Sequence, residues 1–278
     1  MIFIFFLFLI VVGKAEAEMI IDERAKNDPR PSFSIEILPW DIVNDVIPNK
    51  SFFTIIDVET GLSFNVQRRA GSKHADVQPL TKKDTKIMKT IYNDKWSWDR
   101  RAILVQYNDR LIPASMNGMP HGAGALQNGF PGHFCVHFYG STTHKTPTPD
   151  LAHKLMILKA GGKLQRYLYN MDPYESIRIM EIAINQHDEN LLSLILSEQE
   201  EGIAQRLIQE INHIEITELS LLPSEDIHAF FGLEVKAKLN WISSEQTQSV
   251  TRGSLLIRKS SPEGQWGIDG KELAGLVK

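Results

Sequence analysis

Residues 131–140 read Pro-Gly-His-Phe-Cys-Val-His-Phe-Tyr-Gly, and they carry the strand pattern on which the predicted fold is built. Within this stretch, apolar side chains alternate with His133, Cys135 and His137. Successive side chains of a β-strand point to opposite faces, so the pattern predicts one face packed on a core and one polar face along a cleft. The thiol would then lie between two imidazoles.

The composition around this strand is that of an ordinary globular protein. The chain has 278 residues, of which 42% are hydrophobic and 23% charged, with a net charge of −4. These values exclude a disordered or fibrous chain, and the absence of a long basic run argues against nucleic acid as a partner. Cys135 is the only cysteine, which excludes an intramolecular disulfide and a cysteine-rich zinc finger.

The N-terminus predicts export. Residues 2–12 form an uninterrupted apolar run, shorter than the roughly 20 residues of a membrane-spanning helix. Ala15-Glu16-Ala17 follows as a small-x-small cleavage site, so residues 1–17 are interpreted as a signal peptide and 18–32 as a lead-in. We expect a secreted protein of the extracytoplasmic cell envelope, with no stable membrane insertion after cleavage.

Residues 33–170 are predicted to form a strand-rich domain. Hairpins are expected over 52–66 and 102–114, because apolar runs flank short turn-type sequences there. A Thr-x-x-Asp start followed by apolar residues at helical spacing predicts a capped helix over 81–92. The Trp96-Ser97-Trp98 segment predicts two indoles on one strand face, where they would stack on sugar rings or pack in the core.

Residues 171–278 are predicted to form a small accessory domain with a different order of elements. Amphipathic helices are expected over 173–187 and 189–211. Strand-like runs follow at 213–221, 230–242, 249–258 and 265–268. Helices followed by an antiparallel meander suggest an NTF2-like or cystatin-like arrangement. The whole chain is therefore assigned to the α+β class, a β-sandwich or barrel followed by a helix-then-sheet domain.

The polar face of the 131–140 strand suits thiol chemistry. A neighbouring imidazole can take the proton of a cysteine thiol and leave a thiolate that attacks a carbonyl carbon. His121-Gly122 lies upstream, so His121 can approach Cys135 from a separate loop as a base.

These residues resemble the catalytic core of the YkuD-type L,D-transpeptidases. The likeness is carried by His121-Gly122 and by the Gly-His-Phe-Cys-Val-His run at 132–137. The family pattern has glycine at the position of Phe134 and arginine at the position of His137. The resemblance covers these motifs, with a looser likeness over residues 50–160.

The resemblance implies a function and a set of residues. It implies that Cys135 is the nucleophile, that His121 or His133 is its base and orienter, and that the substrate is a peptidoglycan stem peptide. An acyl-enzyme on Cys135 would be passed to an amine or to water, with no cofactor. Substrate contacts are expected from the residues that line the same cleft, which are His74, Asp76, Gly122 and His137.

Two other functions stay open. His74, Asp76, His121 and His133 offer the nitrogen and oxygen ligands of a zinc-dependent peptidoglycan peptidase or amidase. Residues four apart on a strand lie about 13 Å apart, so His133 and His137 are not expected to share a metal. The third possibility is a cell-wall-binding protein without catalysis.

Overall fold

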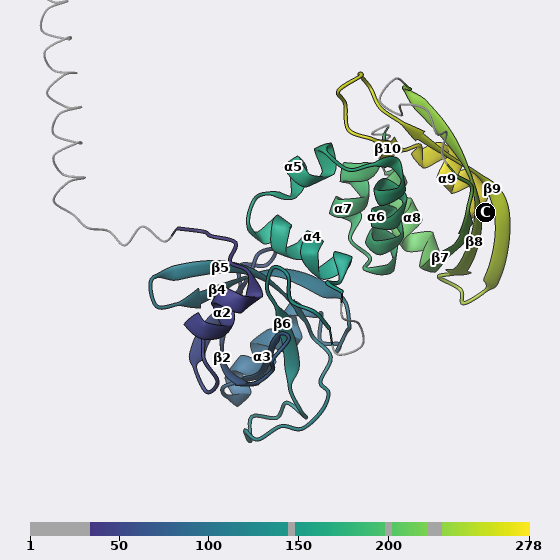
Figure 1. Cartoon of the computed structure of the whole chain (residues 1–278). Coiled ribbons are helices and arrows are strands. Elements are labelled where there is room, and N and C mark those ends of the chain that lie inside the picture. Colours follow the sequence, from purple (N-terminus) through teal and green to yellow (C-terminus); the bar gives the residue numbers. More distant parts are fainter. Residues whose placement is uncertain (1–33, 144–147, 198–201, 222–229) are drawn as a thin grey trace, which may run out of the picture.

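The computed structural model describes residues 34–143, 148–197, 202–221 and 230–278, which form a barrel and a helix-and-sheet part (Figure 1). The predicted signal peptide and lead-in, residues 1–32, lie outside the described residues. Among the residues that are described, no helix is both long enough and apolar enough to cross a membrane. The α+β class is confirmed.

Six of the described strands close into a barrel in which every pair of neighbours is antiparallel. Their order around the barrel is β1, β2, β3, β6, β5, β4. The strands are β1 (Phe52–Asp57), β2 (Ser63–Ala70), β3 (Ala75–Pro79), β4 (Arg100–Tyr107), β5 (Arg110–Asn117) and β6 (Phe134–His137). The two predicted hairpins are confirmed as β1–β2 and β4–β5.

Strand β6 confirms the predicted core-facing alternation, but the polar face is not open along a cleft, because Cys135 and His137 are buried as well. Phe134 and Val136, followed by Phe138, are fully or almost fully buried in the barrel core. The strand lies between β3 and β5, and its register sets Cys135 opposite Asp76 and His137 opposite Ser115. Because the core takes one face of β6, the cysteine face is turned toward the neighbouring loops and helix.

Two short helices cover the barrel. The predicted capped helix is confirmed as α3 (Lys82–Ile91), where Thr81 and Asp84 form a reciprocal capping box. Asp84 also accepts a hydrogen bond from the backbone N–H of Asn65 on β2 at 2.9 Å, which ties the helix start to the barrel. Helix α2 (Trp40–Val46), which the strand-rich reading of this region missed, buries Val43.

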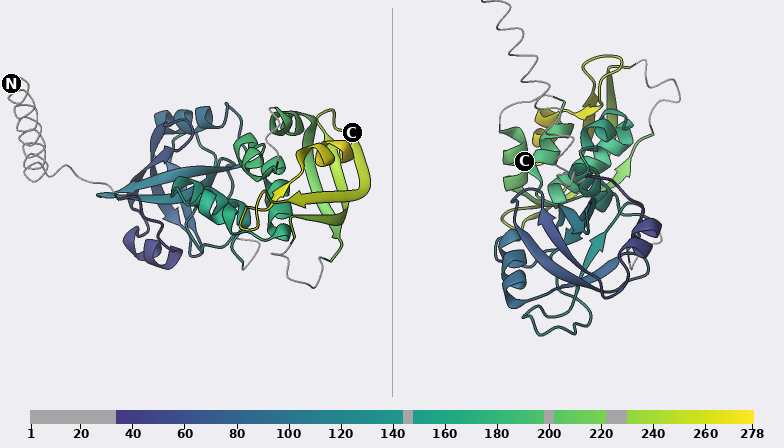
Figure 2. Two further views of the ribbon diagram at one scale, coloured as in Figure 1. Left: turned by 90° about the horizontal axis from the view of Figure 1, so that it is seen from above. Right: turned by 90° about the vertical axis from the view of Figure 1, so that its left-hand side faces the viewer.

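The C-terminal part packs helices on one face of a curved sheet (Figure 2). The sheet order is β10, β9, β8, β7, with strands β7 (Ile211–Leu219), β8 (Gly232–Ser243), β9 (Gln248–Arg258) and β10 (Gly267–Ile268). Its helices are α5 (Leu164–Tyr169), α6 (Pro173–Asn185), α7 (Glu189–Ile195), α8 (Ile203–Glu210) and α9 (Gly270–Leu276). The predicted order of helices and then an antiparallel meander is confirmed, while the NTF2-like or cystatin-like assignment stays a prediction.

The single helix predicted over 189–211 is wrong. Helix α7 ends at Ile195, and α8 begins only at Ile203. Between them the backbone leaves the helix to meet β10, since the N–H of Ser197 donates to the carbonyl of Ile268 at 2.8 Å. Helices α5 and α9 are too short to give a clear sequence period and were not expected.

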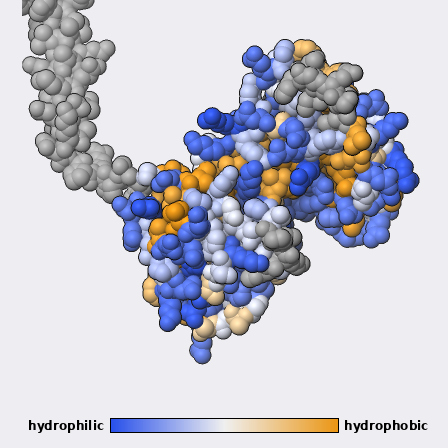
Figure 3. All heavy atoms as spheres, in the orientation of Figure 1, coloured by the Kyte–Doolittle hydropathy of each residue, from blue (hydrophilic) through white to orange (hydrophobic). Residues whose placement is uncertain are grey.

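Helix α4 (Leu151–Ala160) connects the two parts. It packs on β4 and β5, and its apolar residues also belong to the core of the C-terminal part. At its end, Lys159 forms ion pairs with Glu59 at 2.7 Å and with Asp188 at 3.2 Å. The predicted domain boundary at residue 170 stays a prediction. Figure 3 shows a mainly hydrophilic surface with an apolar patch over the edge of the barrel near β4 and β5.

The capping box gives a test of the fold. Thr81→Ala removes one cap bond and is expected to lower the free energy of unfolding by about 1 kcal/mol. Asp84→Ala is expected to cost more, because it removes the same cap together with the link to Asn65. Urea unfolding measures both losses, with Lys86→Ala on the exposed side of α3 as the control. Equal losses for the two cap variants would contradict the link to β2.

Candidate active site

The site forms where β3 and β6 pair. Asp76 and Cys135 are direct partners in this antiparallel ladder, so their side chains lie on the same face. The Cys135 thiol, on a residue that is 4% exposed, lies 3.9 Å from Oδ1 of Asp76. Burial is the main cause that raises the pKa of the Cys135 thiol far above its usual value, and the charge and hydrogen bond of Asp76 raise it further. The resting side chain is therefore a neutral thiol.

A backbone bridge brings His121 to the cysteine. The N–H of His121 donates to the carbonyl of His133 at 2.9 Å, and the N–H of His133 donates back at 2.8 Å. Gly132 makes this approach possible, because a Cβ there would lie 2.4 Å from the His121 carbonyl oxygen, and its φ is +120°. The loop that carries His121 is thus fixed directly beside the start of β6.

His121 is oriented as a base toward Cys135. Its Nδ1 lies 2.9 Å from the carbonyl of Met119, which accepts hydrogen bonds only, so Nδ1 carries the hydrogen. In the neutral ring, Nε2 then carries the lone pair, and it lies 3.2 Å from Sγ of Cys135. This arrangement allows the imidazole to accept the thiol proton directly.

His133 lies on the same face but contacts Asp76 rather than the thiol. Its Nδ1 is 3.0 Å from the carbonyl of Ala123, and its Nε2 is 3.8 Å from Oδ1 of Asp76. Among the described residues, this buried Nε2 has no hydrogen-bond partner. Gly122 has φ +60°, and a Cβ there would lie 2.3 Å from the His133 ring, so this glycine makes room for the imidazole. A role for Gly122 in substrate binding stays a prediction.

His74 is held between the loop after β6 and Asp76. Its Nδ1 lies 2.8 Å from the carbonyl of Thr142, and its Nε2 lies 3.2 Å from Oδ1 of Asp76. The residue is 1% exposed. The structure therefore brings the predicted His74–Asp76 pair together and places it against Cys135.

His137 is the middle ring of a buried stack. Its ring centroid is 4.5 Å from that of His74 and 3.8 Å from that of His153 on α4. Burial is the main cause that lowers the pKa of both His137 and His153 far below the usual range, and the neighbouring imidazoles and Arg100 lower it further. Both rings are therefore neutral, with Ser141 Oγ at 3.1 Å from Nδ1 of His137 and Ser115 Oγ at 2.9 Å from Nδ1 of His153.

The two predicted tryptophans do not form one strip. Residues 96–99 precede β4 and are not in a strand, so the alternation expected there is wrong. Trp96 packs edge-on against Phe130 at 5.1 Å, whereas Trp98 is 52% exposed and lies 5.2 Å from the ring of His121. One indole is therefore partly buried against the barrel core, and the other borders the candidate base.

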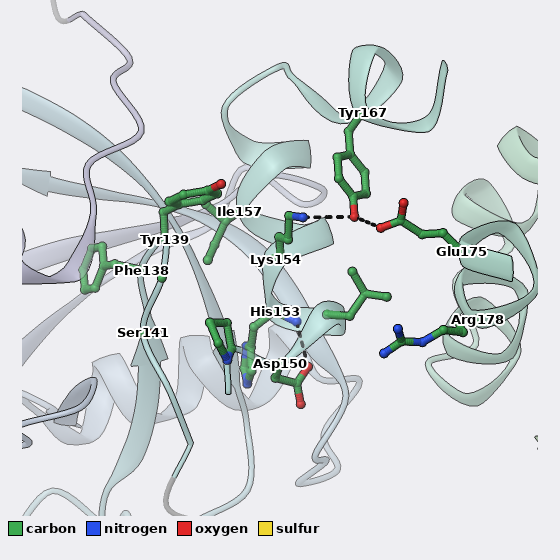
Figure 4. Close-up of a pocket in the computed structure, with 13 residues that line it drawn as sticks. Phe138, Tyr139, Ser141, Asp150, His153, Lys154, Ile157, Tyr167, Glu175 and Arg178 are labelled. Carbon is green, nitrogen blue, oxygen red and sulfur yellow. Dashed lines mark hydrogen bonds between the residues drawn. The ribbon is translucent and has the colours of Figure 1, made fainter. Parts of the chain in front are cut away.

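A cavity of about 350 Å³ lies next to the histidine stack, between the residues after β6 and helices α4, α5 and α6. Figure 4 shows a chain of hydrogen bonds along one wall, from Lys154 to the hydroxyl of Tyr167 and on to Glu175. The guanidinium of Arg178 points into the same space. His153 lines the cavity and touches His137, so the pocket adjoins the cysteine cluster through the stack.

Three donors among the described residues lie close enough to hold one metal ion. They are Cys135, His74 and His137, whose ligand atoms all lie within 4.8 Å of one another. This group shares only His74 with the zinc set predicted from the sequence, because His121 faces the sulfur and His133 faces Asp76. The sequence did not predict that His153 stacks on His137, because His153 lies on a separate helix and no local pattern indicates this contact.

No protein-family model, no curated protein and no solved structure matches this chain significantly. The geometry of its own residues is therefore the basis for every functional inference below.

The histidine stack predicts a dependence of stability on pH. Since folding lowers the pKa of His137 and His153, the unfolded chain binds protons below about pH 6.5 that the folded protein rejects. Stability is thus complete above that pH and falls as the pH drops below it, by at most about 1.4 kcal/mol per pH unit for each imidazole. Denaturant unfolding between pH 8 and pH 5 measures the slope.

The control for this prediction is a pair of variants. The His137→Gln/His153→Gln double variant is expected to flatten the slope, whereas His213→Gln, at an exposed position on β7, is expected to leave it unchanged. An equally steep slope in the double variant would show that other groups cause the acid sensitivity.

Asp76 offers a separate test of the thiol. Asp76→Asn keeps the shape of the side chain but removes the negative charge that opposes the thiolate, so the pKa of Cys135 is expected to fall. Alkylation by iodoacetamide at pH 7.5 is expected to become at least about threefold faster, since one pKa unit corresponds to about a tenfold change in thiolate. Asp45→Asn, on the exposed side of α2, is the control. A slower or unchanged rate would contradict the assigned influence of Asp76.

Proposed function

We propose that the protein is a cysteine-dependent acyltransferase or hydrolase of the cell envelope, similar to L,D-transpeptidases and acting on peptidoglycan stem peptides. One observation carries this proposal: Nε2 of His121 lies 3.2 Å from Sγ of Cys135, and the Met119 carbonyl holds the opposite nitrogen. A nucleophile, a base and a group that orients the base are the minimum set for covalent acyl transfer.

The proposed reaction begins with a neutral thiol. As Sγ of Cys135 attacks the peptide carbonyl carbon, its proton passes to Nε2 of His121. The carbon–nitrogen bond then breaks, and the departing amine takes that proton from His121. The acyl group on sulfur is released by the amine of a second stem peptide or by water, whose proton returns through His121 to the thiol.

The raised pKa of Cys135 fits a concerted proton transfer. Because burial and Asp76 both oppose a resting thiolate, the charge on sulfur is expected only while His121 takes the proton. This favours reaction with a bound substrate over reaction with small electrophiles from solution.

The cavity beyond the histidine stack, which Cys135 does not line, offers charges of both signs to a peptide substrate. The cavity beside the stack presents Lys154 and Arg178 as cations and Glu175 as an anion. A stem peptide carries charges of both signs, so each has a complementary partner here. Trp98, exposed beside His121, offers an apolar surface for the sugar or peptide next to the scissile bond.

The test is intact-protein mass spectrometry of the chelator-treated protein after incubation with a tetrapeptide stem or a carbapenem. A covalent adduct on Cys135 is expected in the wild type and none in Cys135→Ala. His121→Gln is expected to slow acylation by about 100-fold or more, while Cys135 remains open to slow alkylation by iodoacetamide. His213→Gln is the matched control.

Two results would overturn the proposal. An adduct that persists in Cys135→Ala would remove the cysteine from the chemistry. Full turnover of stem peptides by the Cys135→Ala variant, abolished by a chelator, would instead assign the activity to a zinc-dependent peptidase.

A further inference from the structure

The face of β6 that carries the candidate nucleophile also gathers metal donors. Sγ of Cys135 and one ring nitrogen each of His74 and His137 lie within 4.8 Å of one another, and all three residues are buried. Zinc binds sulfur at about 2.3 Å and imidazole nitrogen at about 2.0–2.1 Å, so the donors need to close by roughly 1 Å around an ion.

The hydrogen bonds behind the two imidazoles are those expected of metal ligands. Metal-binding histidines usually donate the hydrogen of one ring nitrogen to a neighbouring oxygen, which fixes the ring and leaves the other nitrogen toward the metal. The Thr142 carbonyl accepts from Nδ1 of His74, and Ser141 Oγ bonds Nδ1 of His137.

The charge balance favours a divalent cation. Oδ1 of Asp76 lies 3.9 Å from Sγ of Cys135 and 3.2 Å from Nε2 of His74. A thiolate next to this buried carboxylate would place two negative charges together. A doubly charged cation beside both groups neutralises them, and the carboxylate then stabilises the ion.

We propose that Cys135, His74 and His137 bind a thiophilic divalent cation such as Zn²⁺, and that the bound ion reversibly blocks the cysteine. The binding step exchanges protons for the metal: the sulfur–hydrogen bond of Cys135 breaks and the sulfur–metal bond forms. The thiol proton is released to solvent, together with any proton held between Nε2 of His74 and Oδ1 of Asp76, which lie 3.2 Å apart. The inhibitory role rests on the proposed function, because the ion inhibits by binding the sulfur that would otherwise attack the substrate. The site itself does not depend on that function.

This site differs in composition and role from a catalytic zinc centre. A catalytic zinc keeps an open position for water, whereas here the candidate nucleophile Cys135 is itself a ligand, together with two imidazoles. His121, the candidate base, is outside this set. A bound metal therefore takes the sulfur away from His121 rather than activating a water molecule.

The test measures metal binding apart from catalysis. Co²⁺ added to the metal-free protein is expected to give a thiolate-to-metal charge-transfer band with one ion per chain, and Zn²⁺ is expected to displace it. The band is expected to vanish in wild-type protein alkylated at Cys135, a control that needs no substitution. Zinc affinity is expected to rise with pH, because each ion displaces a proton.

Matched variants identify the imidazole ligands. His137→Gln is expected to weaken zinc binding by about 10- to 100-fold, whereas His153→Gln changes the outer ring of the same buried stack and is expected to keep the affinity within about threefold of the wild type. Circular dichroism checks that both variants are folded. Equal weakening in both would show that the stack matters only structurally, and would overturn the assignment.

The inhibitory role is tested by the rate at which iodoacetamide labels Cys135. For each variant, the rate with zinc is compared with the rate of the same variant without metal. Zinc is expected to suppress labelling at least about tenfold in the wild type and in His153→Gln, and labelling is expected to recover after chelation. Absence of the cobalt band would overturn the metal site while leaving the acyl-enzyme test intact. Faster peptide turnover with zinc bound would overturn the inhibitory role.

Discussion

The chemistry of this site depends on the register between two short strands. Strand β6 spans only Phe134–His137, and its pairing with β3 sets Cys135 directly opposite Asp76. A shift by one residue would turn the cysteine into the barrel core and the phenylalanines toward solvent. The burial of Phe134 and Val136 therefore stabilises the position of the thiol as much as it stabilises the barrel.

The same register places two opposing influences on the sulfur. Burial and the charge of Asp76 oppose a thiolate, whereas Nε2 of His121 is placed to receive the proton. In the proposed reaction, the two influences do not conflict, because negative charge develops on the sulfur only as its proton moves to His121. A site of this kind differs from one in which a preformed thiolate–imidazolium pair makes the cysteine generally reactive.

Local patterns in the sequence predicted the local parts of the structure. The alternation in β6, the two hairpins and the capping box of α3 depend on residues close together in the chain, and these predictions are confirmed. The contact between Cys135 and Asp76 joins residues far apart in sequence, so no periodicity reveals its distance or its effect on the thiol. The break between α7 and α8 was missed for the same reason, since its cause is pairing with the distant β10.

At His137, long-range packing determines the charge and the surroundings of a residue that the local motif alone does not specify. The family pattern that the 132–137 run resembles has a permanently charged arginine at this position, whereas this chain has a buried, neutral imidazole between two other rings. A fixed cation would stabilise a thiolate without help. Without it, the negative charge of Asp76 and of any thiolate must be balanced by a proton held on a histidine or by a metal ion. In the proposed metal site, the imidazoles offer donors for a proton or a metal ion at the place where the resembled pattern has a permanent charge. The proposed reactivity of Cys135 would then depend on the supply of protons and metal ions around the protein.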